Sequence, residues 1–188
     1  MTTGAISKKI SLGELLQLAA SMPETELELN TFRDAVSRLE LSEALIEEHI
    51  GFCDETYSRN LVMLTPVFEM LVMCWRPGQL STVHDHLDSF ALSKVLRGTL
   101  FNRNYRRLDD GSVDGRAELE VVNDELIGPG DWSALDRGGI HQMGNAPEAD
   151  EDLVTLHFYA RPLREIHVFQ PDEGLVERVR LAYSMLNF

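Results

Sequence analysis

The sequence has few cysteines, few basic residues and no long apolar run. Cys53 and Cys74 are its two cysteines, too few for a disulfide framework, so we expect a protein of the reducing cytosol. Lysine and arginine number 17 against 31 acidic residues, and the net charge of -14 argues against a nucleic-acid partner. Glu14 and Gln17 interrupt the first apolar run, so we expect neither a signal peptide nor a membrane anchor, and hence a cytoplasmic protein.

Length and hydrophobic content favour one domain. A chain of 188 residues that is 44% hydrophobic can bury one core, so we expect a single domain over residues 1–188. Up to about residue 55 the apolar spacing is helical. Ser11 and Glu14 have the spacing of a capping box, which predicts a short helix through Leu18.

The remainder, from about residue 56 to 188, is typical of β structure. Short β-branched and aromatic runs alternate there with Gly, Pro, Asn and Asp. The predicted strands are Glu69–Trp75, Phe90–Leu96, Thr99–Arg106, Glu118–Val122, Asp131–Ala134, Leu153–Tyr159 and Glu165–Phe169. Many short strands without intervening helices predict a β-barrel or jelly roll. The segment from Leu175 to Leu186 fits a helix as well as an edge strand.

A pair of histidines gives the clearest chemical signal. His84 and His86 lie two residues apart on a predicted strand, so their side chains share one face and Asp85 points away. His141 follows about one small β-meander later and could supply a third ligand from a neighbouring strand. These residues predict a site with three neutral nitrogen ligands. Taken alone, the His-x-His pair could equally be an accident of a surface strand.

Glycines frame both histidine segments. Gly78 precedes His84 by six residues and Gly98 follows His86 by twelve, while Gly138 and Asn145 flank His141. Both segments resemble the two signature motifs of the cupin superfamily, which implies a cupin-type barrel with a helical N-terminal extension. The first cupin motif usually adds a carboxylate ligand four or five residues after its second histidine. Ser89, Phe90 and Ala91 stand in that region here, so the predicted site has no carboxylate.

Two further clusters are candidates for substrate binding and catalysis. Arg59, with Tyr57 two residues before it, could clamp a carboxylate through two parallel hydrogen bonds, although spacing alone favours a surface arginine. Thr155, His157 and Tyr159 share one face of a predicted strand and could form a hydrogen-bonded relay. Taken alone, that relay is better explained as an exposed polar strand face.

In combination these motifs resemble the cysteine dioxygenase family, from about residue 50 to residue 170. The matching segments, in order, are Tyr57-Ser-Arg59-Asn60, Cys74-Trp75, His84-Asp-His86-x-Asp88-Ser89, Gly98, Gly138-x-x-His141-x-x-x-Asn145 and Thr155-x-His157-x-Tyr159. The resemblance implies a mononuclear non-haem Fe(II) on His84, His86 and His141, with positions left open for a thiol and O2. It also implies that both oxygen atoms are added to the sulfur of a small thiol, as in L-cysteine to cysteine sulfinate.

The same resemblance assigns roles to the other candidates. Arg59 would pair with the substrate carboxylate and Tyr57 would help to orient it. Tyr159 would place its hydroxyl near the reacting atoms, His157 would hold Tyr159, and Thr155 would hold His157. Family members are commonly monomeric, so we expect a monomer whose partners are its thiol substrate and O2.

One departure from the family concerns a covalent cross-link. Vertebrate members carry a cysteine that is linked to the tyrosine equivalent to Tyr159, and Ala91 stands at that position here. The sequence therefore predicts an unmodified Tyr159, as in bacterial members.

The substrate and the class of chemistry leave alternatives open. Arg59 favours L-cysteine, and 3-mercaptopropionate and mercaptosuccinate are alternatives; for the latter, Arg161 or Arg164 could clamp the second carboxylate. Because nitrogen ligands alone do not select one metal, a cupin hydrolase or isomerase with Zn, Mn or Ni is a further alternative. A non-catalytic cupin that binds a small molecule is the third. A positioned phenol such as that of Tyr159 favours the thiol dioxygenase over the other two classes, because a protein that only binds a small molecule does not need one.

Overall fold

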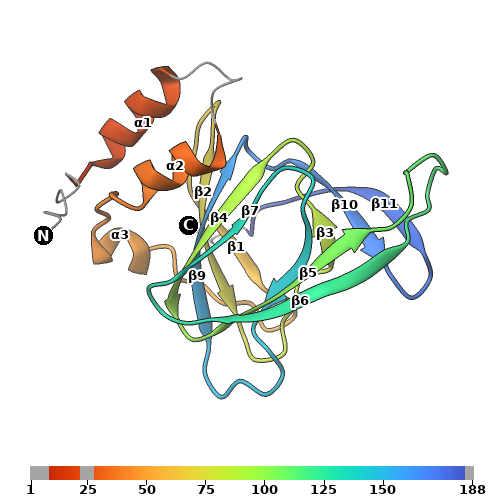
Figure 1. The fold of residues 1–188 in the computed structure, drawn as a ribbon. Helices are drawn as coiled ribbons and strands as arrows, with labels where there is room; N and C mark the ends of the chain where they lie inside the picture. The colour runs from red at the N-terminus through yellow and green to blue at the C-terminus, as the bar shows by residue number, and fades with distance from the viewer. Residues whose placement is uncertain (1–8, 22–27, 185–188) are drawn as a thin grey trace, which may run out of the picture. The chain divides into compact units, whose positions relative to one another are not determined.

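The computed structural model describes residues 9–21 and 28–184 (Figure 1). The chain divides between Glu48 and His49 into two compact units, and each is described by itself. The first unit is helical and the second is built from β-strands, which confirms a mainly β protein with N-terminal helices. No helix within these described ranges is long and apolar enough to cross a membrane.

The N-terminal unit contains the three helices α1 (Leu12–Ser21), α2 (Leu29–Val36) and α3 (Glu43–Glu47). The predicted capping box is present at the start of α1. The Ser11 amide donates to the Glu14 carboxylate at 2.8 Å, and the Glu14 amide donates to Ser11 Oγ at 3.2 Å. These bonds satisfy amides that have no partner inside the helix. The apolar faces of α1 and α2 bury a small core, to which Leu15 and Phe32 contribute the largest side chains.

The second unit consists of two antiparallel sheets (Figure 1). The five-stranded sheet has the order β1 (Ser58–Leu64), β2 (Glu69–Trp75), β9 (Leu153–Ala160), β4 (Phe90–Arg97) and β7 (Trp132–Leu135). The six-stranded sheet has the order β11 (Leu175–Arg180), β10 (Glu165–Gln170), β3 (Val83–Asp85), β8 (Ile140–Gly144), β5 (Leu100–Arg107) and β6 (Leu119–Ile127). This arrangement confirms the mainly β fold of barrel or jelly-roll type.

The two sheets pack face to face around a shared core. Leu71 and Trp75 from β2 lie in one buried cluster with Leu100 and Met143 from the opposite sheet. β2 and β9 are buried along their whole length because each has a strand on both sides and a sheet against one face. β6 is mostly exposed, as expected of an edge strand. The middle of the five-stranded sheet therefore lines the interior.

All seven predicted strands exist, within one or two residues at most ends; β6 runs five residues further than predicted. Of the segment from Leu175 to Leu186, which fits a helix or an edge strand, Leu175–Arg180 forms the edge strand β11 and pairs with β10 along its full length. Residues 185 and 186 lie outside the described ranges. The seven ranges omit β1, β3 and β8. The His-x-His spacing by itself predicts a strand that carries both histidines, but β3 ends at Asp85 and His86 follows it. β3 and β8 have three and five residues, too short for the alternation of apolar and polar residues to stand out.

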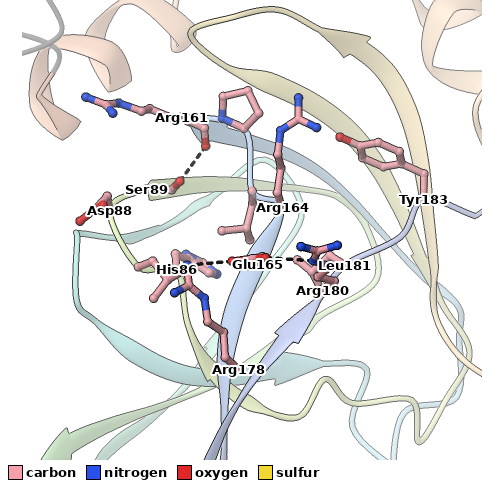
Figure 2. Close-up of a pocket in the computed structure, with 13 residues that line it drawn as sticks. His86, Asp88, Ser89, Arg161, Arg164, Glu165, Arg178, Arg180, Leu181 and Tyr183 are labelled. Atoms are coloured by element: carbon pink, nitrogen blue, oxygen red, sulfur yellow. Dashed lines mark hydrogen bonds and ion pairs between the residues drawn. The ribbon is translucent and has the colours of Figure 1, made fainter. Parts of the chain in front are cut away.

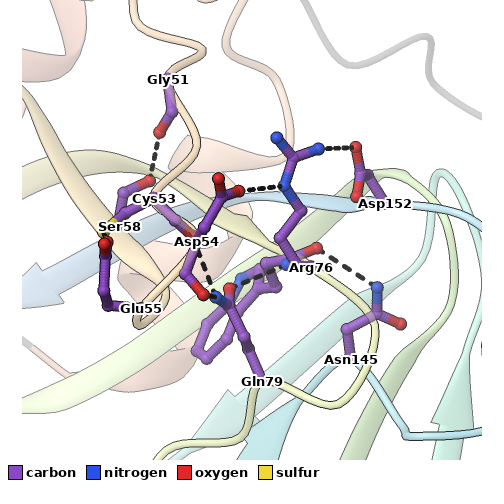
Figure 3. A network of polar contacts seen from close by, with 10 residues as sticks. Gly51, Cys53, Asp54, Glu55, Ser58, Arg76, Gln79, Asn145 and Asp152 are labelled. Atoms are coloured by element: carbon purple, nitrogen blue, oxygen red, sulfur yellow. Dashed lines mark hydrogen bonds and ion pairs between the residues drawn. The ribbon is translucent and has the colours of Figure 1, made fainter.

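The glycine-framed motifs meet in space. The Gly78 amide donates to the Asn145 carbonyl at 3.1 Å, and the buried Asn145 side chain donates to the carbonyls of Trp75 and Glu151. Beside this contact Arg76 bridges Asp54 and Asp152 (Figure 3). Gly98 has a φ of +78°, and a Cβ there would lie 2.8 Å from a backbone oxygen, so glycine is required between β4 and β5.

Candidate metal centre and substrate pocket

Three histidines converge inside the second unit. His84 lies on β3, His86 follows the end of that strand, and His141 lies on β8, directly opposite His84 in the pairing of the two strands. One ring nitrogen of each can be chosen so that all lie within 4.8 Å of one another, and all three side chains are buried. The structure therefore brings together the three residues predicted as ligands.

Hydrogen bonds fix which nitrogen of two of these rings faces inward. His84 Nδ1 lies 2.9 Å from the Thr82 carbonyl, which can only accept, so Nδ1 carries the proton. His141 Nδ1 likewise lies 2.9 Å from Asn102 Oδ1. In both rings Nε2 is then left as a lone pair directed at the centre of the cluster, which is the form that binds a metal.

The orientation of Asn102 is itself fixed. Its amide nitrogen donates to Glu125 at 3.0 Å and to Asn104 Oδ1 at 3.2 Å, so its oxygen must face His141. Asn102 lies on β5, one strand away from His141 in the same sheet. Sequence reasoning missed this residue, because only the pairing of β5 with β8 shows the contact.

The cluster fits a metal cation. His84 Nε2 and His86 Nε2 lie 3.1 Å apart, and His141 Nε2 has no hydrogen-bond partner among the described residues. Burial lowers the pKa of His84 to about 4, and burial together with repulsion between the rings holds the pKa of His86 and of His141 well below the usual value. The Nε2 lone pairs of His84 and His141, with His86 Nε2 beside them, are costly in a dry interior, and a bound cation removes that cost.

Asp85 points away from the histidines, as its place on the strand predicts. Its carboxylate accepts from the His167 amide at 2.9 Å and contacts His167 Nδ1 at 2.8 Å. This pair ties β3 to β10, so His167 supports the ligand strand rather than the ligands themselves. The donor set within the described residues therefore consists of nitrogen atoms alone.

The predicted relay is present and buried. Thr155 Oγ1 lies 2.8 Å from His157 Nε2, and the Tyr159 hydroxyl lies 3.1 Å from His157 Nδ1. All three residues are at most 2% exposed, so the alternative of an exposed polar strand face is wrong. The sequence did not predict two further members of this hydrogen-bonded relay. Trp75 Nε1 donates to Thr155 Oγ1 at 3.0 Å, and Ser93 Oγ lies 2.9 Å from His157 Nδ1.

These contacts decide the protonation of the relay. Burial, helped by the charge of Arg59, lowers the pKa of His157 to about 3, so the ring is neutral. Thr155 Oγ1 already accepts from Trp75 and lies 3.5 Å from the Met73 carbonyl, to which it can donate. It then accepts a second hydrogen bond, from His157 Nε2–H, and His157 Nδ1 is left with a lone pair that can accept from the Tyr159 hydroxyl at 3.1 Å or from Ser93 Oγ at 2.9 Å. Burial raises the pKa of Tyr159 to about 12, so that proton stays in place at neutral pH.

Arg59 is buried beside this relay. It is 8% exposed, so the alternative of a surface arginine is wrong. Its guanidinium lies 5.5 Å from the centre of the Tyr159 ring, and Nη2 lies 3.6 Å from the Glu69 carboxylate, too far for a hydrogen bond. Nε and Nη2 are buried without a hydrogen-bond partner in the part of the chain that the structure describes. Such donors fit an anionic ligand.

The histidine cluster and the relay belong to one site. The rings of His86 and Tyr159 meet edge to face with centroids 5.2 Å apart. Tyr57 stacks on Trp75 at 4.3 Å, and burial raises its pKa. A cleft of about 530 Å³ includes His86 among its lining residues and is bordered by four arginines, namely Arg161, Arg164, Arg178 and Arg180 (Figure 2). The cleft therefore reaches the histidine cluster at His86.

Comparison with known proteins identifies the family. The family model described as cysteine dioxygenase type I matches residues 21–172. The chain belongs to the cysteine dioxygenase family. It is 30% identical over 138 residues to cysteine dioxygenase type 1 of Danio rerio, and 28% identical over 129 residues to that of Bos taurus. Each match covers 68% of this chain and 62% of the relative, so the chain spans less than two thirds of these relatives' length.

Family membership confirms the resemblance drawn from the motifs and extends it. The match begins near the end of α1, whereas the motifs start near residue 50. The match contains all eight of the candidate site residues, from Tyr57 to Tyr159. A thiol dioxygenase is therefore the first activity to consider for this site.

Proposed function

We propose that this member of the cysteine dioxygenase family is an Fe(II)-dependent thiol dioxygenase that converts L-cysteine to cysteine sulfinate. A buried cluster of three neutral histidines beside a buried arginine and a buried tyrosine carries the proposal. In the reaction a thiolate and O2 give a sulfinate. Sulfur loses four electrons, O2 gains them, and the thiol proton leaves.

His84, His86 and His141 would hold the iron through Nε2. Once bound, iron lowers the pKa of the substrate thiol and brings sulfur and O2 together. The chain supplies the fixed ligands. Thr82 and Asn102 hold the rings of His84 and His141 in the tautomer that leaves Nε2 free.

Arg59 would bind the substrate carboxylate. Its two unpartnered N–H groups are the donors that a carboxylate satisfies, and burial strengthens such a charge-assisted pair. Tyr57, held by its stack on Trp75, would limit the orientation of the bound molecule. This anchor would keep the thiol end of the substrate directed to the histidine cluster.

Tyr159 would hold a proton close to the reacting atoms. Its hydroxyl lies 3.1 Å from His157 Nδ1 and would donate to it, so its oxygen would accept a hydrogen bond from the substrate while the phenol stays neutral. His157 and Thr155 fix the phenol through the chain of bonds that ends at Trp75. Ala91 lies opposite Tyr159 on β4 and has no sulfur, so we propose an unmodified Tyr159. A loss of two hydrogens at Tyr159 in the mass of the mature protein would contradict this.

A thiol with two carboxylates, such as mercaptosuccinate, is a second candidate substrate. The arginine-lined cleft favours it, because four guanidinium groups gather there in a chain with a net charge of -14 (Figure 2). Glu165 pairs with Arg178 and Arg180, and Arg161 and Arg164, which line the same cleft, are the candidate clamps for the second carboxylate. An Arg164→Gln variant that turns over mercaptosuccinate as fast as the wild type would remove Arg164 from this role.

Oxygen uptake by the Fe(II)-loaded protein tests the proposal. L-Cysteine, 3-mercaptopropionate and mercaptosuccinate are supplied in turn, and products are identified by mass spectrometry. We expect uptake with L-cysteine and a product heavier by two oxygen atoms. Uptake with another thiol alone would keep the chemistry and change the substrate. No uptake, together with tightly held zinc in the purified protein, would favour a non-oxygenase metal-binding cupin. A monomeric state and a cytoplasmic location stay predictions.

A further inference from the structure

Glu69 is a buried acid in the wall of the proposed substrate site. It is the first residue of β2 and lies directly opposite Tyr159 of β9, so both side chains are on the same face of the sheet. It is fully buried, and a buried carboxylate needs partners. The Leu163 amide donates to Oε1 at 3.1 Å, the Tyr183 hydroxyl donates to Oε2, and Arg59 supplies the opposite charge.

The C-terminal segment holds both members of this ion pair. After β11 ends at Arg180, the chain runs alongside β1. The Arg59 amide donates to Ser184 Oγ at 2.8 Å, and the Ser184 amide donates to the Arg59 carbonyl at 2.9 Å. Its neighbour Tyr183 borders the arginine-lined cleft (Figure 2). The Tyr183 hydroxyl also donates to Glu69. Ser184 therefore fixes the backbone of Arg59, and Tyr183 fixes the carboxylate of Glu69. Each of these contacts joins residues more than 110 positions apart in the sequence.

The ion pair leaves the donors of Arg59 available. At 3.6 Å Glu69 attracts the guanidinium without taking a hydrogen bond from it, so Nε and Nη2 stay free for another acceptor. The Tyr183 hydroxyl and the Leu163 amide donate to Glu69 and so compete with Arg59 for its lone pairs. Burial of Tyr183 and its hydrogen bond to Glu69 raise the pKa of Tyr183 to about 12, so the hydroxyl stays a donor.

We propose that Tyr183 and Glu69 are positioning residues for the substrate carboxylate: Tyr183 holds Glu69, and Glu69 holds the guanidinium of Arg59 with its donors facing the site. The C-terminal segment thereby completes the binding site of the barrel. This inference rests on the proposed role of Arg59. It predicts a contribution to the binding of the carboxylate alone, whereas a purely structural role of Tyr183 would affect every ligand of the site equally.

Two thiols that differ in the carboxylate alone test the proposal. The dissociation constants of L-cysteine and cysteamine are measured by calorimetry on the anaerobic Fe(II)-loaded protein. Tyr183→Phe removes one hydroxyl and keeps the ring. Tyr105→Phe is the matched control, because Tyr105 is also partly buried and packs in the separate cluster around Phe169. Glu69→Gln keeps the shape of the side chain and removes its charge.

We expect Tyr183→Phe and Glu69→Gln to weaken L-cysteine binding about tenfold, the equivalent of one charge-assisted hydrogen bond, and to change cysteamine binding less than about twofold. The Tyr105→Phe control should bind both thiols like the wild type. Equal weakening of both thiols in Tyr183→Phe, or no weakening of L-cysteine, would overturn the inference. A wild type that binds L-cysteine selectively through Tyr183 yet takes up no oxygen would refute the proposed function and leave this inference standing.

Discussion

Mild acid should destabilise the metal-free protein, because folding buries four neutral histidines. His84, His86, His141 and His157 all have a pKa in the folded protein below the ordinary value, and burial is the largest cause for each. In the unfolded chain each returns to a pKa of about 6.5 and takes up a proton as the pH falls. The unfolded state then binds more protons than the folded one, so stability is full above pH 6.5 and is lost as the pH falls below it.

The loss in free energy of unfolding at pH 5.5 is set by the protonation of histidines in the unfolded chain alone. There an unfolded histidine is protonated about ten to one, which favours unfolding by about 1.4 kcal/mol. The folded-state values, about 4 for His84 and about 3 for His157, lie well below this pH, so the folded rings take up almost no proton. The four histidines together cost about 5 kcal/mol relative to pH 7.5, which is comparable with the whole stability of many domains.

Urea unfolding of the metal-free protein at pH 7.5, 6.5 and 5.5, followed by tryptophan fluorescence, measures this loss. The opposite trend follows from net charge, because acid lowers the self-repulsion of a chain that carries -14. A free energy of unfolding that is constant or rises between pH 7.5 and 5.5 would therefore refute the burial of neutral histidines. Reloading with metal at pH 7.5 should raise the unfolding midpoint, since metal binds the folded site preferentially.

Three further changes have defined outcomes. Asn102→Leu removes the acceptor that orients His141 and should lower metal affinity about 10- to 100-fold in chelator competition; unchanged affinity would argue against this role. Ala91→Cys places a thiol opposite Tyr159 and should yield, after turnover, a protein lighter by two hydrogens than expected, while an unchanged mass would mean that the two side chains do not meet. Gly98→Ala forces a Cβ to within 2.8 Å of a backbone oxygen at a φ of +78° and should cost about 1–3 kcal/mol in urea unfolding; a wild-type midpoint would show that the turn adapts.

The strands that the sequence predicts are those whose apolar pattern reflects burial. β2 and β9 combine apolar or β-branched residues over seven and eight positions, and both lie in the middle of a sheet. The ligand strand β3 has three residues, and its pattern is dominated by His84 and Asp85, so local preference says little about it. The His-x-His spacing could still predict that His84 and His86 share one face. That inference needs only the alternation of side chains along a strand, and it does not depend on how long the strand is.

The partners of the site residues could not be predicted, because they depend on which strands are neighbours. Asn102 contacts His141 from β5, and Ser93 contacts His157 from β4. Glu69 belongs to a strand that the sequence predicts, yet nothing in its sequence neighbours indicates the hydrogen bond from Tyr183. Each of these contacts joins residues at least 39 positions apart, and pattern within one segment cannot reveal them.

The same limit explains why two simpler interpretations were wrong, namely a surface position for Arg59 and an exposed polar face for the strand that carries Thr155, His157 and Tyr159. An alternating strand such as β9 predicts two faces, and an apolar face is expected inside. Here both faces of β9 are buried, so Thr155, His157 and Tyr159 have to find partners within the protein. They find them in Trp75, Ser93 and one another. Five buried side-chain atoms among the described residues lack a hydrogen-bond partner; four of them lie on Arg59, His86 and His141, and the fifth is Asn145 Oδ1. Because buried polar groups are normally paired, the concentration of unpaired donors and lone pairs at this one place is the physical reason to expect a ligand and a metal there.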